Sequence, residues 1–289
     1  MKILVVVNPI AGKGKPLKLL PKIKDMAGSN GNHIRWIVTA SAAEMDHLIR
    51  SAPSQGYDSV FLTGGDGTVH QALPALQDIQ LPFGLIPLGR GNDFARNIGL
   101  PLAIQKNPLV TGKLKYMTID SPLVNGIPFV SIASVGFDAL VTQLAGENKG
   151  FFQGTPGYVV CVLRALGRFK PVEVKITVDE DTWKGRIMLV AVANGPYYGG
   201  GMKVAPQASV TSGLFSVCIV QQLSKMSLLR EFPKVFLGKH TTHPKVMIKS
   251  GKRVTIQGDT AYDVCADGET ASKLPAHCEI AARKLSVIL

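Results

Sequence analysis

The residues best suited to chemistry form the segment Gly-Gly-Asp-Gly-Thr at 64–68, directly after the apolar run 59–62. Glycine costs conformational entropy in helices and strands, so three glycines around one carboxylate predict a turn. Backbone N–H groups in such a turn approach a phosphate with no side chain in the way. The Asp66 carboxylate would meet a metal ion or a hydroxyl there. Alone, the motif is equally consistent with an ordinary strand-to-helix connection.

Four further segments carry glycine, charge or both. Residues 8–15 (Asn-Pro-Ile-Ala-Gly-Lys-Gly-Lys) follow the first apolar run but lack both the P-loop and the dinucleotide-binding spacing. Residues 87–96 and 194–202 are glycine-rich and also follow predicted strands, and Asp267-Gly268-Glu269 holds two carboxylates around a glycine. Each would be an ordinary turn by itself. The carboxyl ends of parallel strands are nevertheless where open α/β sheets bind ligands.

The elements that must position these segments change in type near residue 120. Before it, strands alternate with helical stretches, which predicts a parallel sheet covered on both faces. The expected strands are 2–7, 33–39, 59–62 and 83–86, and the expected helices are 16–27, 42–52 and the stretch from the Asp66 turn to about residue 77. After it, short β-rich runs predominate, at 129–133, 172–178, 187–193, 215–220, 245–248 and 254–257, interrupted by apolar-periodic stretches at 157–169 and 224–239.

Composition narrows the class of protein. With 46% hydrophobic and 18% charged residues, the 289-residue chain is globular, and no apolar run approaches the roughly 18 residues of a membrane span. A net charge of +12 favours nucleotide phosphates or an anionic membrane face. Nucleic acid is disfavoured because zinc-finger and ribonucleoprotein motifs are missing. Four cysteines without CxxC spacing predict reduced thiols and a cytoplasmic location.

In this order, the segments resemble the diacylglycerol kinase catalytic-domain family, which includes soluble bacterial lipid kinases and sphingosine kinases and is more distantly related to NAD kinases. The resemblance covers nearly the whole chain. It is carried by NPxxGxGK from Asn8, GGDGT from Gly64, PxGxGNDFAR from Pro87, NGPYYGGGM from Asn194 and DGE from Asp267.

The resemblance implies a fold and its division into domains. A Rossmann-like parallel-sheet nucleotide domain is expected over residues 1–120, with a strand near 281–289 returning to it. A β-sandwich domain for the lipid substrate is expected over 121–280. The resemblance further implies that ATP and Mg²⁺ bind in the cleft between these two domains.

The resemblance also implies roles for residues. Asp66 is expected to be the catalytic base or its metal-linked partner, with Glu269 as the alternative base and Asp93 near the acceptor or the metal. Asp66 and Asp267 are the expected ligands of the Mg²⁺ that accompanies ATP. The expected nucleotide-binding residues are Asn8, Pro9, Gly12, Lys13, Gly64, Gly65, Gly67, Thr68, Gly89, Arg90, Gly91 and Asn92.

Three departures from the family pattern stand out. Arg90 replaces a common threonine, and would either reach a phosphate bidentately or crowd the nucleotide turn. His70-Gln71 replaces a common Asn-Glu pair. In 211–216, Thr211, Ser212 and Ser216 stand where aspartates are common, and Mg²⁺ prefers carboxylates. An accessory structural Mg²⁺ site is therefore predicted to be absent.

The function expected is transfer of the γ-phosphoryl group of ATP to a hydroxyl of a glycerol-based lipid, diacylglycerol first. Two alternatives remain. One is an NAD kinase, which is disfavoured because Asn92-Asp93 stands where that family usually has Asn-Glu. The other is a catalytically silent nucleotide- or lipid-binding module.

The expected partner is a membrane lipid at the inner face of the membrane, with peripheral contact to anionic lipid. The basic-apolar stretch 224–239 would either touch that bilayer or pack on the sandwich, and the sequence leaves a homodimer open.

Overall fold

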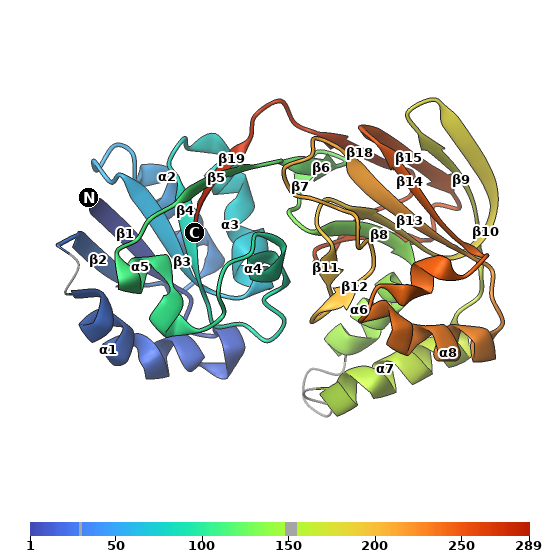
Figure 1. The fold of residues 1–289 in the computed structure, drawn as a ribbon, viewed down its shortest axis with the longest axis horizontal. Coiled ribbons are helices and arrows are strands. Elements are labelled where there is room, and N and C mark those ends of the chain that lie inside the picture. Colours follow the sequence, from blue (N-terminus) through green and yellow to red (C-terminus); the bar gives the residue numbers. More distant parts are fainter. Residues whose placement is uncertain (29–30, 148–154) are drawn as a thin grey trace. The chain divides into compact units, whose positions relative to one another are not determined.

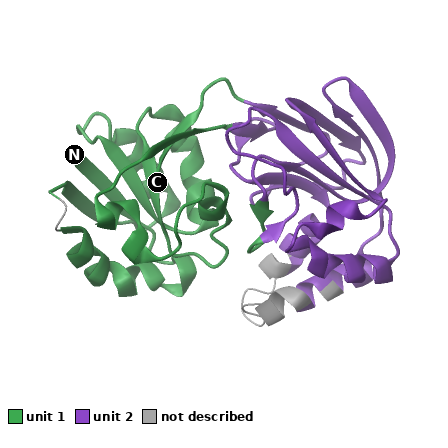
Figure 2. Ribbon diagram, in the orientation of Figure 1, with its two compact units in different colours: residues 1–121, 197–201, 281–289 green, residues 122–196, 202–280 purple. Residues whose placement is uncertain are grey.

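The structure, a computed structural model, describes residues 1–28, 31–147 and 155–289. It divides into two compact units (Figure 2). Unit 1 contains residues 1–121, 197–201 and 281–289, and unit 2 contains residues 122–196 and 202–280. Each unit is described by itself below.

Unit 1 is built on a sheet with the strand order β2-β1-β3-β4-β19-β5 (Figure 1). Its strands are β1 (Lys2–Val7), β2 (His33–Val38), β3 (Ser59–Gly64), β4 (Phe83–Pro87), β5 (Tyr116–Ile119) and β19 (Leu285–Ile288). All neighbouring pairs are parallel except β19 with β5. Parallel pairs require crossover connections, which the intervening helices supply.

Helices cover both faces of this sheet. They are α1 (Lys15–Ala27), α2 (Ala42–Ser51), α3 (Asp66–Asp78), α4 (Asp93–Asn97) and α5 (Pro108–Thr111), with short helical turns η1 (Ala11–Lys13) and η3 (Ile104–Lys106). Ile3, Val5 and Val7 lie on one face of β1 and pack in one core cluster with residues of α1 and α5. Leu4 and Val6 are equally buried, and the two-residue period of a strand turns them to the opposite face. Both faces of β1 are therefore apolar, as expected for a covered parallel strand.

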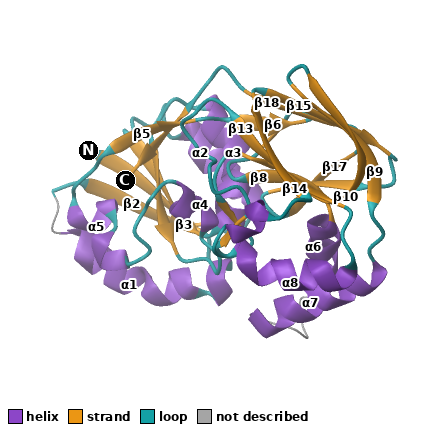
Figure 3. Cartoon of the chain, turned by 45° about the vertical axis from the view of Figure 1, so that its right-hand side comes forward, coloured by secondary structure: helices purple, strands orange, loops and turns teal. Residues whose placement is uncertain are grey.

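Unit 2 is an antiparallel β structure, strongly curved in Figure 3. Its main path runs β17-β16-β8-β10-β9-β15-β18-β6-β7, and β13 pairs with both β10 and β14. The strands are β6 (Pro122–Val124), β7 (Ile127–Pro128), β8 (Ile132–Gly136), β9 (Val172–Val178), β10 (Asp181–Ala193), β12 (Met202–Lys203), β13 (Phe215–Gln221), β14 (Val246–Gly251), β15 (Arg253–Gly258), β16 (Asp263–Ala266), β17 (Glu269–Lys273) and β18 (Ala276–Ile280). β11 (Tyr197–Tyr198) belongs to unit 1.

The helices of unit 2 are α6 (Phe137–Glu147), α7 (Thr155–Arg168), α8 (Lys225–Val235) and the short turn η4 (Lys239–Thr242). Inside the sheet, Phe129 and Phe215 stack with ring centroids 6.1 Å apart. All four cysteines are buried and unpaired. Among the described residues, no helix combines the length and the apolar character needed to cross a membrane.

The predicted fold class, an α/β parallel-sheet domain followed by a predominantly β domain, is confirmed. The individual elements differ in places. Strand β10 begins at Asp181 rather than near 187, because its first residues are exposed and polar yet pair fully with β9. Strands β16 to β18 were not predicted, since each has only four or five residues. Helix α6 was not predicted either.

Candidate functional site

Two glycine-rich turns meet at the carboxyl edge of the unit 1 sheet. They follow β3 and β4, which are parallel neighbours with Gly64 opposite Pro87, so both strands end at the same place. A Cβ atom built on Gly65 would lie 2.6 Å from the Cα of Gly89, closer than real side chains come. The Leu88 N–H donates to the Gly64 carbonyl at 2.8 Å. The two turns therefore form a single rigid backbone surface.

The loop after β1 joins the same edge. The Asn8 side-chain amide donates to Thr68 Oγ1 at 3.0 Å, and Asn8 Oδ1 accepts from the Ile10 N–H at 3.2 Å. Gly12 has φ +51°, and a Cβ there would lie 2.0 Å from the Leu88 carbonyl oxygen, so glycine alone fits. Pro9 and the exposed Lys13 belong to this loop. The predicted residues from all three loops thus lie together.

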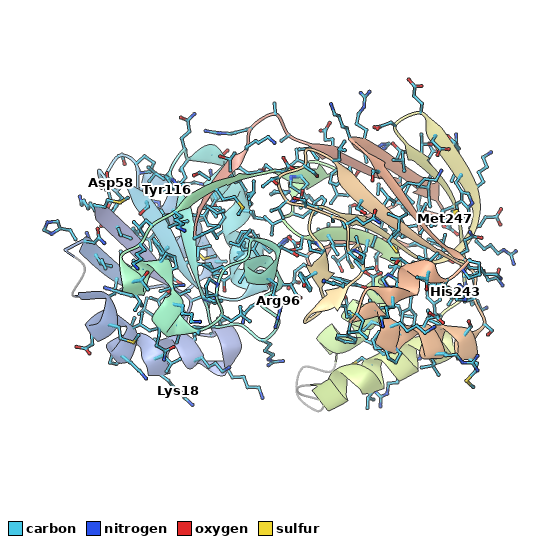
Figure 4. All side chains as sticks on the ribbon, viewed as in Figure 1. Lys18, Asp58, Arg96, Tyr116, His243 and Met247 are labelled. Atoms are coloured by element: carbon cyan, nitrogen blue, oxygen red, sulfur yellow. The ribbon has the colours of Figure 1, made fainter. Side chains whose placement is uncertain are left out.

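A pocket of about 490 Å³ opens beside these loops in unit 1. Its walls combine apolar side chains, two lysines of α1 and the backbone of the β4 turn. The lining residues are Lys15, Lys18, Leu19, Pro87, Leu88, Gly89, Asn92, Leu102 and Ile104. Figure 4 labels Lys18 on α1. Apolar walls suit a flat ring, and ammonium groups suit phosphates, so the pocket fits a nucleotide.

The turn after β4 is fixed by Asn92. This residue has φ 53° and precedes α4; its Oδ1 accepts from the Gly89 N–H at 2.8 Å and its Nδ2 donates to the Gly89 carbonyl at 3.2 Å. Asn92 therefore shapes the turn that lines the pocket. Arg90 is exposed between Gly89 and Gly91, so its guanidinium stands at the turn rather than in the core.

Two carboxylates, Asp66 and Asp93, flank Gly91. A Cβ on Gly91 would lie 3.0 Å from Asp66 Oδ2 and 3.1 Å from Asp93 Oδ2. The two carboxylate oxygens therefore lie within about 6 Å of each other, which is close enough for their charges to repel. Asp66 Oδ1 accepts from the Phe94 N–H at 2.9 Å, and this hydrogen bond ties the β3 turn to α4. The structure thus brings together these two predicted catalytic residues.

The environment of Asp93 is unusual for an aspartate. Burial raises its pKa to about 6, the backbone hydrogen bond from Gly200 opposes the rise, and the nearby Asp66 carboxylate adds to it. The Gly200 N–H reaches Asp93 Oδ2 at 2.6 Å. Asp93 Oδ1 is buried without a hydrogen-bond partner, and Arg96 Nε stays 3.9 Å from it. Figure 4 labels Arg96, a residue of α4. Perturbed carboxyls of this kind are common at functional sites.

The pair also fits a divalent cation that arrives with phosphates. Mg²⁺ in phosphoryl-transfer sites is bound by one or two carboxylates together with substrate phosphates and water. Asp66 and Asp93 supply such a pair, and the buried Asp93 Oδ1 has a free acceptor lone pair. Within the described ranges, no group of three or more His, Cys, Asp or Glu side chains could hold a metal by protein atoms alone.

The other two predicted acidic residues belong to unit 2. The Asp267 carboxylate accepts backbone N–H groups from Val130, Ser131 and Ile132 at 2.8, 2.8 and 3.1 Å, so it organises the start of β8. Glu269 is exposed at the start of β17. Their expected roles as metal ligand and base stay predictions.

The serine-rich segment before β13 is held by hydroxyl groups. Ser209 Oγ and Thr211 Oγ1 are 3.1 Å apart, and Ser212 Oγ donates to the Leu214 carbonyl at 3.0 Å. Ser216 is buried on β13. The predicted absence of a structural Mg²⁺ here remains a prediction.

Two features of unit 1 were missed by sequence reasoning. Asn97 donates to the Tyr197 carbonyl at 3.0 Å and accepts from the Tyr197 N–H at 2.8 Å, which holds the 197–201 segment against α4 and brings Gly200 to Asp93. The motifs around both residues had been noticed, but not their pairing. Asp120 is fully buried and accepts from Lys284 at 2.5 Å. No local pattern signalled that pair.

Comparison with known proteins agrees with this arrangement. Residues 2–120 match the diacylglycerol kinase catalytic domain, and residues 131–289 match the YegS C-terminal NAD kinase beta sandwich-like domain. The chain is 32% identical to a protein named diacylglycerol kinase from Mycobacterium tuberculosis over 99% of this chain and 94% of that one. It is 26% identical to the protein of the same name from Bacillus subtilis, over 99% of this chain and 95% of that one. A solved structure from Bacillus anthracis str. Sterne shares the fold with a TM-score of 0.80 at 22% identity, over 99% of this chain and 96% of that one. This chain belongs to the diacylglycerol kinase family of lipid kinases.

Proposed function

We propose that this protein transfers the γ-phosphoryl group of ATP, with Mg²⁺, to the free hydroxyl of diacylglycerol, giving phosphatidic acid. The observation that carries the proposal is the Asp66–Asp93 carboxylate pair at Gly91, beside a pocket that two lysines and a glycine-rich backbone line. The names of the bacterial relatives support diacylglycerol as the acceptor.

The protein's own contribution to this reaction is positioning and charge. Phosphoryl transfer needs the donor and the acceptor oxygen in line, and little covalent chemistry from the enzyme. Lys15 and Lys18 would attract phosphate oxygens at the pocket. The missing Cβ atoms of Gly65 and Gly89 let the two turns pack against each other, which fixes the Asp66 turn beside the pocket that Gly89 lines.

Asp66 is our choice for the base that accepts the acceptor hydroxyl proton. The Phe94 N–H donates to its Oδ1 and so fixes the orientation of the carboxylate. Base catalysis of this kind accelerates a reaction about 10²–10⁴-fold. Asp93, with its raised pKa, is the partner that ionises fully only above about pH 6.

Asp66 and Asp93 would hold the Mg²⁺ that arrives with ATP, and the ion would supply charge neutralisation for the transferred phosphoryl group. Glu269 is the alternative base and is tested beside Asp66.

The test is phosphate transfer from radiolabelled ATP with Mg²⁺ to a panel of lipids in mixed micelles, with NAD included as an acceptor. Four proteins are compared: wild type, Asp66→Asn, Glu269→Gln and Asp25→Asn. Asp25 is an exposed carboxylate on α1 and serves as the matched control. We expect label in diacylglycerol, a loss of 10²-fold or more in Asp66→Asn and no loss in Asp25→Asn.

Other outcomes overturn specific parts of the proposal. Label in NAD rather than lipid would make the protein an NAD kinase. ATP binding without transfer to any acceptor would make it a silent binding module. A larger loss in Glu269→Gln than in Asp66→Asn would move the base to unit 2.

A further inference from the structure

Helix α8 departs from the usual amphipathic pattern at two positions. A surface helix of a globular protein buries its apolar face and exposes its charges. On α8, the residue that is buried is a carboxylate, Glu231, whereas Met226 is 68% exposed. Immediately after the helix, Phe236 is 45% and Leu237 is 69% exposed. The remaining apolar residues of the stretch are half-buried: Leu228, Leu229, Phe232 and Val235.

These exposed side chains form a local cluster rather than a scatter. The described large hydrophobic side chains that are exposed in unit 2 are Leu214, Met226, Phe236 and Leu237, and three of these four lie within residues 226–237. Phe236 packs edge-on against Phe232, with ring centroids 6.1 Å apart, so the aromatic residues present a continuous apolar surface. Exposed apolar side chains gathered in one segment, rather than scattered singly, are typical of interaction sites.

The same surface carries positive charge that the described structure does not neutralise. Lys225 donates to the uncharged Gly167 carbonyl at 2.8 Å, which fixes the helix beside the end of α7 and leaves the charge in place (Figure 1 shows both helices). Arg230 and Lys239 are exposed and have no carboxylate partner within the part of the chain that the structure describes. Lys234 alone is paired, with Glu231 at 2.7 Å. Glu231 is also the sole acidic residue in the sequence from 224 to 245.

We infer that the α8 surface, defined as Lys225, Met226, Arg230, Phe236, Leu237 and Lys239, is a docking surface for an anionic lipid bilayer. Apolar side chains flanked by uncompensated lysine and arginine are what an interfacial helix needs: the apolar groups enter the acyl boundary and the cations meet lipid phosphates. A second copy of the chain fits less well, because two such surfaces would bring like charges together at their interface.

This surface shares no residue with the proposed catalytic site, so it is tested by binding alone. Flotation with vesicles of mixed phosphatidylglycerol and phosphatidylcholine, in the absence of ATP, gives membrane affinity. Phe236→Ser with Leu237→Ser removes apolar contact, and Val38→Ser with Leu214→Ser is the matched control, since both control residues are exposed elsewhere. Arg230→Gln with Lys239→Gln removes charge, and Lys184→Gln with Lys252→Gln, also exposed, is its control.

The apolar variant is expected to lose roughly tenfold or more in affinity. The charge variant is expected to lose about 25-fold in membrane affinity, because each of the two cations contributes about fivefold. The loss should be smaller at high salt, which screens these charges. Both control variants, and Asp66→Asn, should float like wild type. Asp66→Asn keeps the two proposals separate, because loss of transfer with normal flotation concerns the catalytic site alone.

Three results would overturn the inference. In the first, the α8 variants would float as wild type does. In the second, the control variants would lose as much membrane affinity as the α8 variants. Alternatively, the α8 variants would change the oligomeric state in size-exclusion chromatography with light scattering and leave flotation unchanged, which would make the surface a self-association interface. Circular dichroism and thermal melting establish that each variant is folded.

Discussion

Gly65 and Gly89 meet backbone to backbone at the carboxyl edge of the unit 1 sheet. A Cβ on Gly65 would lie 2.6 Å from the Cα of Gly89, and one on Gly89 would lie 2.4 Å from the Cα of Gly65. The turn that holds Asp66 and the turn that holds Asp93 are therefore locked to each other by the absence of side chains. The spacing of the carboxylate pair depends on this contact.

The first prediction is that Gly89→Ala separates the two turns. The added methyl group would meet backbone and Asn92 Oδ1, which lies 2.7 Å from the Cβ position, so the neighbours must move. Overpacking of this kind costs about 1–3 kcal/mol. We expect a comparable loss in the free energy of unfolding and a loss of phosphate transfer, measured by urea denaturation and the transfer assay.

Gly67→Ala is the control for that experiment. No heavy atom lies within 4 Å of its Cβ position, and alanine is favoured over glycine inside a helix such as α3. Its stability should match or exceed wild type. Equal stability of the two variants would show that the Gly65–Gly89 contact yields without cost.

The second prediction concerns pH. Asp93 has a pKa of about 6 in the folded protein, raised from 3.8 mainly by burial. Between these two values the folded state binds more protons than the unfolded state, so the contribution of Asp93 to stability falls as pH rises through this window. Asp93→Asn removes this dependence. Relative to wild type, the variant should gain stability from pH 4 to pH 7, by up to about 3 kcal/mol.

Denaturation followed by Trp36 fluorescence measures this effect. Trp36 lies in unit 1 and the other tryptophan, Trp183, lies in unit 2, so a Trp183→Phe background reports on unit 1. The buffers contain a chelator, because a bound cation would hold the carboxylate ionised. A constant difference between variant and wild type across this range would mean that burial does not perturb Asp93.

The third prediction separates nucleotide binding from chemistry. Lys18 lines the 490 Å³ pocket, whereas Lys22, one turn further along α1, is exposed outside it. Lys18→Met should raise KM for ATP about tenfold with kcat little changed, because it removes a charge-assisted contact to phosphate. Lys22→Met should leave both constants unchanged. Equal effects of the two substitutions would point to general surface charge instead of a contact in the pocket.

The sequence predicted those features of the site that depend on residues close together in the chain. The turns around Asp66 and Asp93 follow apolar strands, and parallel neighbours end at one edge, so their meeting was predictable. Asp267 was recognisable as a carboxylate in a turn, but its three N–H donors lie about 135 residues away, and no local pattern reveals them. The periodicity of 224–239 predicted a helix without saying which face is covered, and the structure buries Glu231. Burial and hydrogen bonding depend on residues that are far apart in the sequence and meet only in the fold. A single sequence does not show which of these residues meet.

The last prediction concerns the ion pair between the buried Asp120 and the half-exposed Lys284. Asp120, fully buried after β5, accepts from Lys284, which precedes β19 and is 43% exposed. Lys284→Met would leave a buried carboxylate without its cation, and breaking such a pair costs about 3 kcal/mol. Adding Asp120→Asn should recover most of that loss, because the buried position then carries no charge. Arg50→Met is the control in the same unit: its partners Asp46 and Asp78 are 38% and 63% exposed, so its loss should stay below about 1 kcal/mol. Urea denaturation with the Trp36 reporter measures all three. If Lys284→Met cost no more than Arg50→Met, burial of Asp120 would be irrelevant to its pairing, and the returning strand β19 would be held by its ladder and apolar contacts alone.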